Sequence, residues 1–151
     1  MRTAHRMRGL VPALALAAAR AARLRVGVAV VTYGNGVPKA LAARGASGVA
    51  CDVIDCPLLS RPPAGLVACL LAGGYRAALL VDVCREGAGP LAQFVPTLRR
   101  ERALPGEWEL LTAAPTYNPL GRTATFVNEA EIADALTAMA QGDPVATPEW
   151  R

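Results

Sequence analysis

Four apolar runs, each followed by turn-forming residues, divide the chain from about residue 26 onward. They are rich in valine, leucine and alanine and show little of the polar–apolar alternation that marks a half-exposed strand. Near-continuous runs of this kind are typical of strands that are buried on both faces. The predicted strands are Val26–Tyr33, Val49–Asp55, Arg76–Val83 and Trp108–Ala113.

Helical patterns occupy the stretches between and after these runs. Pro38 suits a first helical turn, and we expect that helix to be short because Gly45 and Gly48 interrupt the helical pattern after Arg44. Asn128 and Glu131 have the spacing of a capping box at the start of the last helix. The predicted helices are Pro38–Arg44, Leu66–Leu71, which Gly73 and Gly74 stop, Pro90–Arg102, and a final helix that buries Ile132, Leu136 and Met139 and ends at Gly142. Pro96 lies inside the third of these helices and predicts either a displaced start or a kink.

Regular alternation of strands and helices predicts the α/β class. We expect a three-layer α/β/α domain with a mostly parallel sheet of four to five strands and helices on both faces. The domain is predicted to cover residues 26–141, after a leader or linker at 1–25 and before a flexible tail at 142–151. A hydrophobic fraction of 53% against 19% charged residues is enough for a buried core, which excludes a disordered chain.

The positive net charge of the chain comes from its leader. Six of the sixteen basic residues, all of them arginines, precede residue 26, and the remaining ten stand against twelve acidic residues. A nucleic-acid-binding domain concentrates positive charge on its folded surface. We therefore expect no nucleic-acid partner.

The leader itself is free of acidic residues and contains the apolar stretch Leu10–Ala19. Three interpretations stay open: an organellar transit peptide, a secretory signal, and an ordinary leading helix or linker. The apolar stretch is shorter than the ~20 residues that span a bilayer, so no membrane partner is expected. The expected location is the cytoplasm or, with a transit peptide, the mitochondrial matrix or a plastid.

The residue types needed for a metal centre or a nucleophile–base pair are sparse in the predicted domain. Its four cysteines form no C-x-x-C pair, and the single histidine, His5, lies in the leader. Cys51 and Cys56 are five residues apart in and beside a strand, which predicts that they face opposite sides of the sheet. We expect buried, reduced thiols, no metal site and no catalytic residue.

Any ligand of such a sheet binds beyond the carboxyl ends of its strands. The predicted ends carry Gly34, Asn35 and Gly36 after the first strand, Asp55 after the second and Asp82 in the third. The glycines are candidates for a phosphate-binding turn, but neither nucleotide-binding fingerprint is complete, and two glycines after a strand are more often ordinary turn residues. The two aspartates form a carboxylate pair if their strands adjoin; otherwise each caps a helix or pairs with an arginine.

Three segments in this order resemble the C-terminal domain of transketolase-type enzymes. They are VVTYGNGV (Val30–Val37), DVIDCPLLSRP (Asp52–Pro62) and ALLVDV (Ala78–Val83), and the later YNPLGRTATFVNEAEI (Tyr117–Ile132) is similar to the family's final loop and helix. The resemblance covers residues 26–140 and is strongest to the β part of thiamine-diphosphate-dependent 2-oxoacid dehydrogenases.

The chain departs from the family pattern at several positions. Cys56 and Ser60-Arg61 replace family features of the second strand and its turn, and Val83 stands where the family has a glutamate. Whatever that carboxylate does in the family is therefore in question for this chain.

The resemblance implies a supporting role. In these enzymes other domains bind thiamine diphosphate and magnesium, through a Gly-Asp-Gly motif with a later Asn that this chain lacks. The C-terminal domain packs against a cofactor-binding subunit or domain, supports the dimer and in some complexes helps hold an acyltransferase core. The implied function is a non-catalytic domain or subunit fragment of a 2-oxoacid dehydrogenase that acts in an oligomer and binds no cofactor alone.

Two alternatives stay open. The chain is otherwise a standalone α/β module that binds phosphate or a nucleotide at the Gly34–Gly36 turn, or a gene fragment without a function. The first alternative predicts phosphate binding by the isolated chain. The second predicts poor solubility, because surfaces that should meet missing domains would be exposed.

Overall fold

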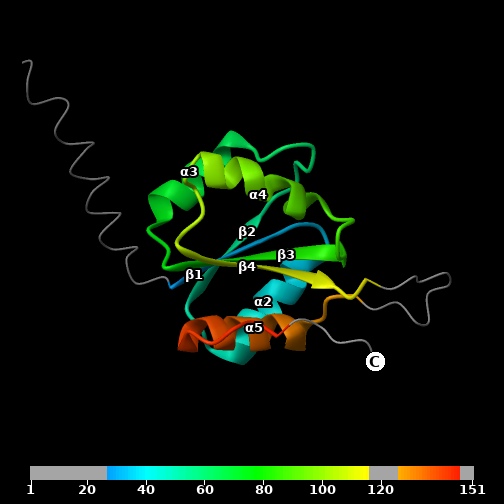
Figure 1. Cartoon of the computed structure of the whole chain (residues 1–151). Coiled ribbons are helices and arrows are strands. Elements are labelled where there is room, and N and C mark those ends of the chain that lie inside the picture. Colours follow the sequence, from blue (N-terminus) through cyan, green and yellow to red (C-terminus); the bar gives the residue numbers. More distant parts are fainter. Residues whose placement is uncertain (1–26, 116–125, 147–151) are drawn as a thin grey trace, which may run out of the picture.

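The fold is a three-layer α/β/α sandwich built on one parallel sheet (Figure 1). The computed structural model describes residues 27–115 and 126–146. The described sheet has four strands in the order β2-β1-β3-β4, all parallel, which confirms the predicted fold class. The strands are β1 (Val28–Thr32), β2 (Cys51–Asp55), β3 (Ala77–Arg85) and β4 (Glu107–Ala113).

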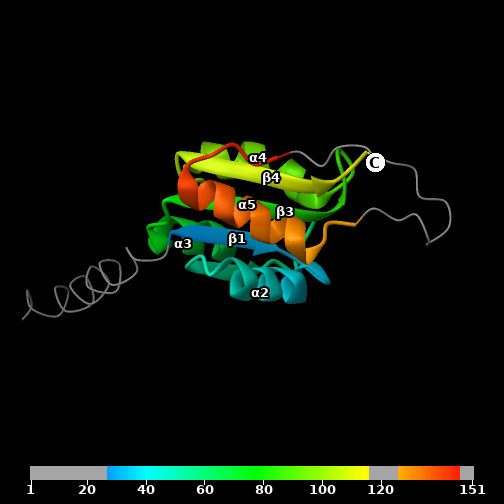
Figure 2. The same cartoon turned by 90° about the horizontal axis from the view of Figure 1, so that it is seen from below.

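Two helices cover each face of the sheet, as Figures 1 and 2 show from two directions. One face carries α2 (Gly36–Ser47) and α5 (Glu129–Gln141), and the other carries α3 (Ala64–Gly73) and α4 (Pro90–Arg100). Each crossover between parallel neighbours passes through a helix, as parallel strands require.

The first strand in the sequence lies inside the sheet. β1 pairs with β2 on one side and with β3 on the other, and all five of its residues are buried. Its alternate side chains enter two separate cores: Val28 and Val30 pack towards α2 and α5, whereas Ala29 and Val31 pack towards α3 and α4. Two buried faces explain why this segment has no polar alternation.

The two buried cysteines divide between the same two cores. Cys51 belongs to the core under α2 and α5, and Cys56 to the core under α3 and α4. Both thiols are free and buried. Their membership of different cores confirms the prediction that they face opposite sides of the sheet.

Two helices differ from their predicted form. α2 continues through Gly45 to Ser47 and ends at Gly48, whose left-handed backbone (φ 66°) donates its N–H to the carbonyl of Arg44. An internal glycine costs only about 1 kcal/mol relative to alanine, so the burial of this helix against the sheet outweighs it. α4 starts at Pro90, undisplaced, and runs through Pro96 to Arg100.

The ends of the domain follow the local signals. Gly74 and Gly142 terminate α3 and α5 in the left-handed conformation, as predicted. Beyond α5, Val145 is partly buried against the core under α2 and α5, and the flexibility predicted for 142–151 stays a prediction. The leader, most of the predicted loop at 115–121 and the last five residues lie outside the described residues.

No helix in the described ranges combines the length and apolar character needed to cross a membrane.

Candidate functional site

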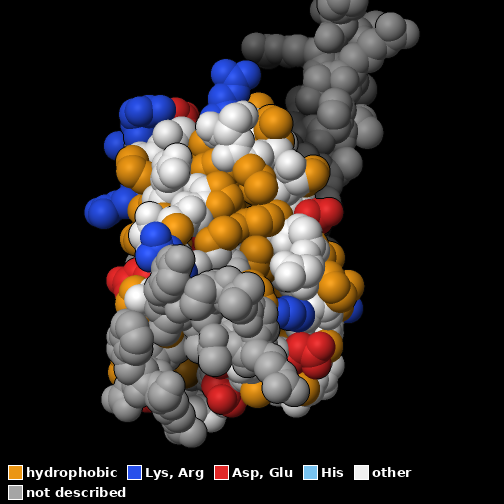
Figure 3. Space-filling model, turned by 90° about the vertical axis from the view of Figure 1, so that its right-hand side faces the viewer, with side chains coloured by type: hydrophobic (Ala, Val, Ile, Leu, Met, Phe, Trp, Pro, Cys, Tyr) orange, Lys and Arg blue, Asp and Glu red, His pale blue; other side chains and the backbone are white. Residues whose placement is uncertain are grey.

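The carboxyl edge of the sheet brings together the turn after β1 and the end of β3. Gly34 and Asn35 are exposed in the turn, and Gly36 is buried as the first residue of α2. Gly34 has a φ of 54°, a conformation that favours glycine. Figure 3 looks onto this edge and shows apolar side chains gathered in a band across the described surface.

Two amide groups of this turn donate to carbonyl groups within it. The N–H of Gly36 donates to the carbonyl of Tyr33 at 3.0 Å, and the N–H of Val37 donates to the carbonyl of Gly34 at 3.2 Å. Pro38, the next residue, has no N–H. A phosphate cradle needs several free amides that point at the ligand. The amides of Gly36 and Val37 therefore cannot bind a phosphate group without breaking the hydrogen bonds of the turn.

Gly36 is required by packing. A Cβ atom at this position would lie 2.1 Å from Oγ1 of Thr32 and 2.8 Å from Cγ1 of Val83. The Thr32 hydroxyl is buried and donates to the carbonyl of Val81 at 2.9 Å, so it cannot move away without losing that bond. The second glycine of the turn thus lets α2 start close against β1 and β3.

Asp82 is a buried cap for α4. Its carboxylate accepts hydrogen bonds from the hydroxyl of Tyr33 at 2.7 Å, from the N–H of Leu91 at 2.9 Å and from the N–H of Cys84 at 3.3 Å. Leu91 lies in the first turn of α4, where unpaired N–H groups and the helix dipole favour a negative charge. Of the two interpretations of this aspartate, the structure shows the helix cap.

Two neighbours hold Asp82 in place. A Cβ atom on Gly89 would lie 2.0 Å from both carboxylate oxygens, so only glycine admits this approach. The Tyr33 hydroxyl also lies 3.3 Å from the Sγ atom of Cys84. Burial, together with the hydrogen bonds to Cys84 and Asp82, raises the pKa of Tyr33 above its usual value. The hydroxyl therefore stays protonated as a donor at neutral pH.

The two aspartates do not form a carboxylate pair. Asp55 is exposed at the end of β2, and β1 lies between β2 and β3. Adjacent strands are about 4.8 Å apart, so the two strand ends are separated by two such spacings. The condition for a paired site, adjoining strands, is not met.

Lys39, which the sequence reasoning did not single out as a ligand, ties two segments together. Its Nζ atom donates to the carbonyl of Val127 at 2.6 Å and lies 5.8 Å from the centroid of the Phe126 ring. The lysine thereby fixes the approach to α5 against α2. Among the described residues, no three His, Cys, Asp or Glu side chains lie close enough together to hold a metal ion.

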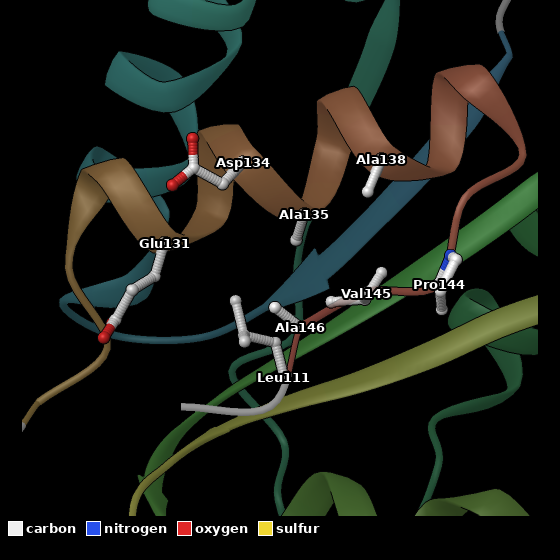
Figure 4. A pocket seen from close by; sticks show the side chains of 8 residues that line it. All are labelled: Leu111, Glu131, Asp134, Ala135, Ala138, Pro144, Val145 and Ala146. Atoms are coloured by element: carbon white, nitrogen blue, oxygen red, sulfur yellow. The ribbon is translucent and has the colours of Figure 1, made fainter. Parts of the chain in front are cut away.

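A cavity of about 300 Å³ lies between α5 and the segment that follows it (Figure 4). Glu131 and Asp134 supply its carboxylates, and Leu111 and Val145 supply much of its apolar wall. Glu131 already accepts from the N–H of Asn128 at 2.8 Å in the capping box of α5. This confirms the predicted cap, and among the described residues Asp134 has no hydrogen-bond partner for its carboxylate.

The outer surface of α3 is the feature that the sequence reasoning missed. The helix has the sequence AGLVACLLAG, with no charged residue and no polar side chain other than a thiol. Leu66 and Leu70 are buried, while Leu71 is 44% exposed. A helix that is apolar on all sides is normally buried on all sides. The signal was present in the sequence as the missing polar face, but only the fold shows that this side is uncovered.

No protein-family model matches the chain, and no curated protein sequence matches it.

Proposed function

We propose that the chain is a non-catalytic assembly domain or subunit of a thiamine-diphosphate-dependent 2-oxoacid dehydrogenase. In this role it would dock against a cofactor-binding chain and support the dimer or a larger complex, which includes an acyltransferase core in some enzymes of the family. The resemblance of three strand-and-turn segments suggests the family, and the α/β/α fold is compatible with it.

The uncovered apolar face of α3 is the observation that carries the docking role. Ala64, Ala68, Leu71 and Ala72 are exposed on this helix, and none of them can hydrogen-bond to water through its side chain. The preceding loop adds Leu58 and Leu59, which are 49% and 36% exposed. Contiguous apolar surface of this kind marks an interaction site on a soluble domain.

The carboxyl edge of the sheet supports the same proposal. Its buried carboxylate, Asp82, caps a helix, and the amides of Gly36 and Val37 bond within the turn. The polar groups that α/β enzymes direct at a ligand are here used to hold the domain together. The diphosphate and magnesium would accordingly be held by the partner chain, and this chain's residues would bind that partner.

The test is recovery of the tagged full chain from its native host, with identification of every protein retained in stoichiometric amount. The proposal predicts a partner that carries the Gly-Asp-Gly motif with its downstream Asn, and thiamine diphosphate bound to the complex. An unrelated tagged α/β protein of similar size serves as the control. A chain recovered alone, or with partners that all lack the motif, contradicts the proposal.

A second measurement addresses the standalone phosphate-binding alternative. Calorimetric titration of the isolated chain with inorganic phosphate and with ATP is expected to show no binding, because Gly36 and Val37 have no free N–H to offer. Binding that is lost on Gly34→Ala, which strains the turn, would favour the small-ligand module instead.

A further inference from the structure

A groove of about 530 Å³ runs along the exposed side of α3. Its apolar wall comes from Val67 and Leu71 of the helix and Leu58 of the preceding loop. Arg61 lies at the start of the helix and Glu101 at the end of α4, so charged side chains border an apolar floor. This combination suits a ligand that is itself apolar on one side and charged on the other.

The charge around the groove is predominantly positive. The loop before α3, the helices α3 and α4, and the two residues after α4 together carry four arginines and one glutamate: Arg61, Arg99, Arg100, Arg102 and Glu101. Of these, Arg61 and Glu101 line the groove itself. All five side chains are exposed, and Glu101 lies 3.6 Å from the Nε atom of Arg100, which partly offsets its charge. A partner with negative charge is therefore favoured here.

The opposite face of the sheet has the other sign. α2 and α5 carry Lys39 and Arg44 against Glu129, Glu131 and Asp134. The contrast shows that the positive charge belongs to the groove side and not to the domain as a whole. The start of α3 adds to it, since Pro63 provides no side-chain cap and the first turn has no acidic residue.

The small residues of α3 set how close a partner can come. Ala64, Ala68 and Ala72 are spaced four residues apart, so they form one exposed row along the helix. Val67 and Leu71 form the neighbouring row, which lines the groove. Rows of this spacing are the ridges and grooves of helix–helix packing, and alanine side chains permit axis separations near the short end of 8–10 Å.

We infer that the α3 groove binds an acidic amphipathic helix of a partner chain. The apolar stripe of that helix would cover the two rows of α3. Its carboxylates would face Arg61 at one end and the arginines in and just after the last turn of α4 at the other. The inference deepens the proposed function, on which it rests, because it names the contact surface and the chemistry of the partner segment.

The probe is a pair of helical peptide pools with leucine at every third or fourth position and either glutamate or lysine at the others. The purified full chain is titrated with each pool, and binding is followed by fluorescence anisotropy and by amide shifts in NMR spectra. We expect the glutamate pool to bind at least about tenfold more tightly than the lysine pool, a difference that narrows as salt is raised. Shifted amides should cluster on α3 and its preceding loop.

Matched variants locate the site. Leu71→Asp places a charge in the groove, and Leu41→Asp places the same charge on α2, where the leucine has the same exposed fraction of 44%. We expect Leu71→Asp to weaken binding of the glutamate pool about tenfold and Leu41→Asp to leave it unchanged. Arg61→Glu should weaken it severalfold, mainly through slower association. Circular dichroism checks that each variant is folded.

Four outcomes overturn the inference. They are equal binding of the two pools, failure of both pools to bind, equal effects of Leu71→Asp and Leu41→Asp, and concentration-dependent self-association that Leu71→Asp abolishes. The last outcome would mean that a second copy of this chain covers the groove.

The inference and the proposed function fail separately. If the glutamate pool binds selectively but no thiamine-diphosphate-binding partner is found in the native host, the groove inference is supported and the dehydrogenase proposal is contradicted. If wild type and Leu71→Asp retain a partner with the cofactor motif equally well, the proposed function is supported and the α3 groove is excluded as the contact surface.

Discussion

The carboxyl edge of the sheet and the outer surface of α3 differ in what their residues leave unsatisfied. At the edge, Asp82 accepts hydrogen bonds from Tyr33 and from the first turn of α4, and the amides of Gly36 and Val37 donate to carbonyl groups of their own turn. On α3, Leu71 and the alanines at 64, 68 and 72 expose apolar side chains to solvent. The polar groups at the sheet edge are thus used in hydrogen bonds within the domain, whereas the outer surface of α3 exposes apolar side chains that no other residue buries in the described part of the chain.

The fold alone does not locate a ligand site, because the polar groups at the expected position can be used within the domain instead. Parallel α/β sheets bind ligands beyond the carboxyl ends of their strands. In this chain the same positions hold a helix cap and a close helix–strand contact. The surface that is left over for recognition lies on a helix, to one side of the sheet.

The strongest test of the closed edge is Asp82→Ala. The substitution leaves the Tyr33 hydroxyl and the amides of Leu91 and Cys84 without their buried acceptor. We expect the free energy of unfolding to fall by about 3–5 kcal/mol. Urea denaturation followed by circular dichroism measures the change. Asp55→Ala, at an exposed strand end, is the control and should change stability by no more than about 0.5 kcal/mol. Near-native stability of Asp82→Ala would mean that the edge is not closed by this cap.

A glycine pair tests the close approach at the same edge. Gly89→Ala places a Cβ atom against the Asp82 carboxylate, and we expect a loss of about 2–3 kcal/mol in the free energy of unfolding. Gly45→Ala lies in open space in α2 and should raise stability by about 0.5–1 kcal/mol through helix propensity. The same denaturation series measures both variants, and equal effects would contradict the packing argument.

Alkaline pH should weaken the edge through Tyr33. Its pKa is raised in the fold by burial, so above pH 10 the unfolded chain loses the phenolic proton while the folded chain keeps it. The unfolded state then binds fewer protons, and stability falls by up to about 1.4 kcal/mol per pH unit, whereas this group contributes no pH dependence below pH 9. Tyr33→Phe removes this contribution. The free energy of unfolding, measured for both proteins at pH 8 to 11, should therefore fall more steeply with pH for the wild type than for Tyr33→Phe above pH 10. Equal slopes would show that the hydroxyl is not buried.

The smallest expected effect concerns the groove side. Arg102, just after α4, has a φ of 54°, which is unfavourable for a residue with a side chain. Arg102→Gly should stabilise the chain by about 1 kcal/mol while removing one positive charge beside the groove. Thermal unfolding and titration with the glutamate peptide pool measure the two quantities. A variant that is more stable yet binds the pool less tightly would sharpen the contrast between the two regions.

Local signals in the sequence were enough for most of the fold. The capping box of Asn128 and Glu131 depends on residues three positions apart, and it forms as predicted. The buried strands follow from their continuous apolar character, and the glycines after α3 and α5 end those helices. The early end predicted for α2 was wrong. The low helix propensity of Gly45 is a local effect, and the burial of Ala40 and Ala43 against the sheet outweighs it.

The arrangement of the candidate site residues depends on strand order and on contacts between distant segments, which the sequence does not show. Whether Asp55 and Asp82 meet is decided by strand order, and β1 lies between their strands. The choice between a ligand site and a helix cap for Asp82 was settled by the position of Leu91 and by the space that Gly89 leaves. The lack of polar residues in α3 was visible in the sequence, but the side of the helix left uncovered was not. The family resemblance stays a prediction.

The division of the interior into two cores has a consequence for how the chain is made. The core under α3 and α4 draws its members from residues between Ala29 and Leu110, so all of them are synthesised before any residue of α5. The core under α2 and α5 cannot close until Ile132, Leu136 and Met139 have been synthesised. At about 5–20 residues per second, β1 therefore spends seconds with one face sealed and the other awaiting α5. A released chain truncated near residue 120, which lacks α5, should thus present that half-covered sheet to whatever meets it first, including a chaperone.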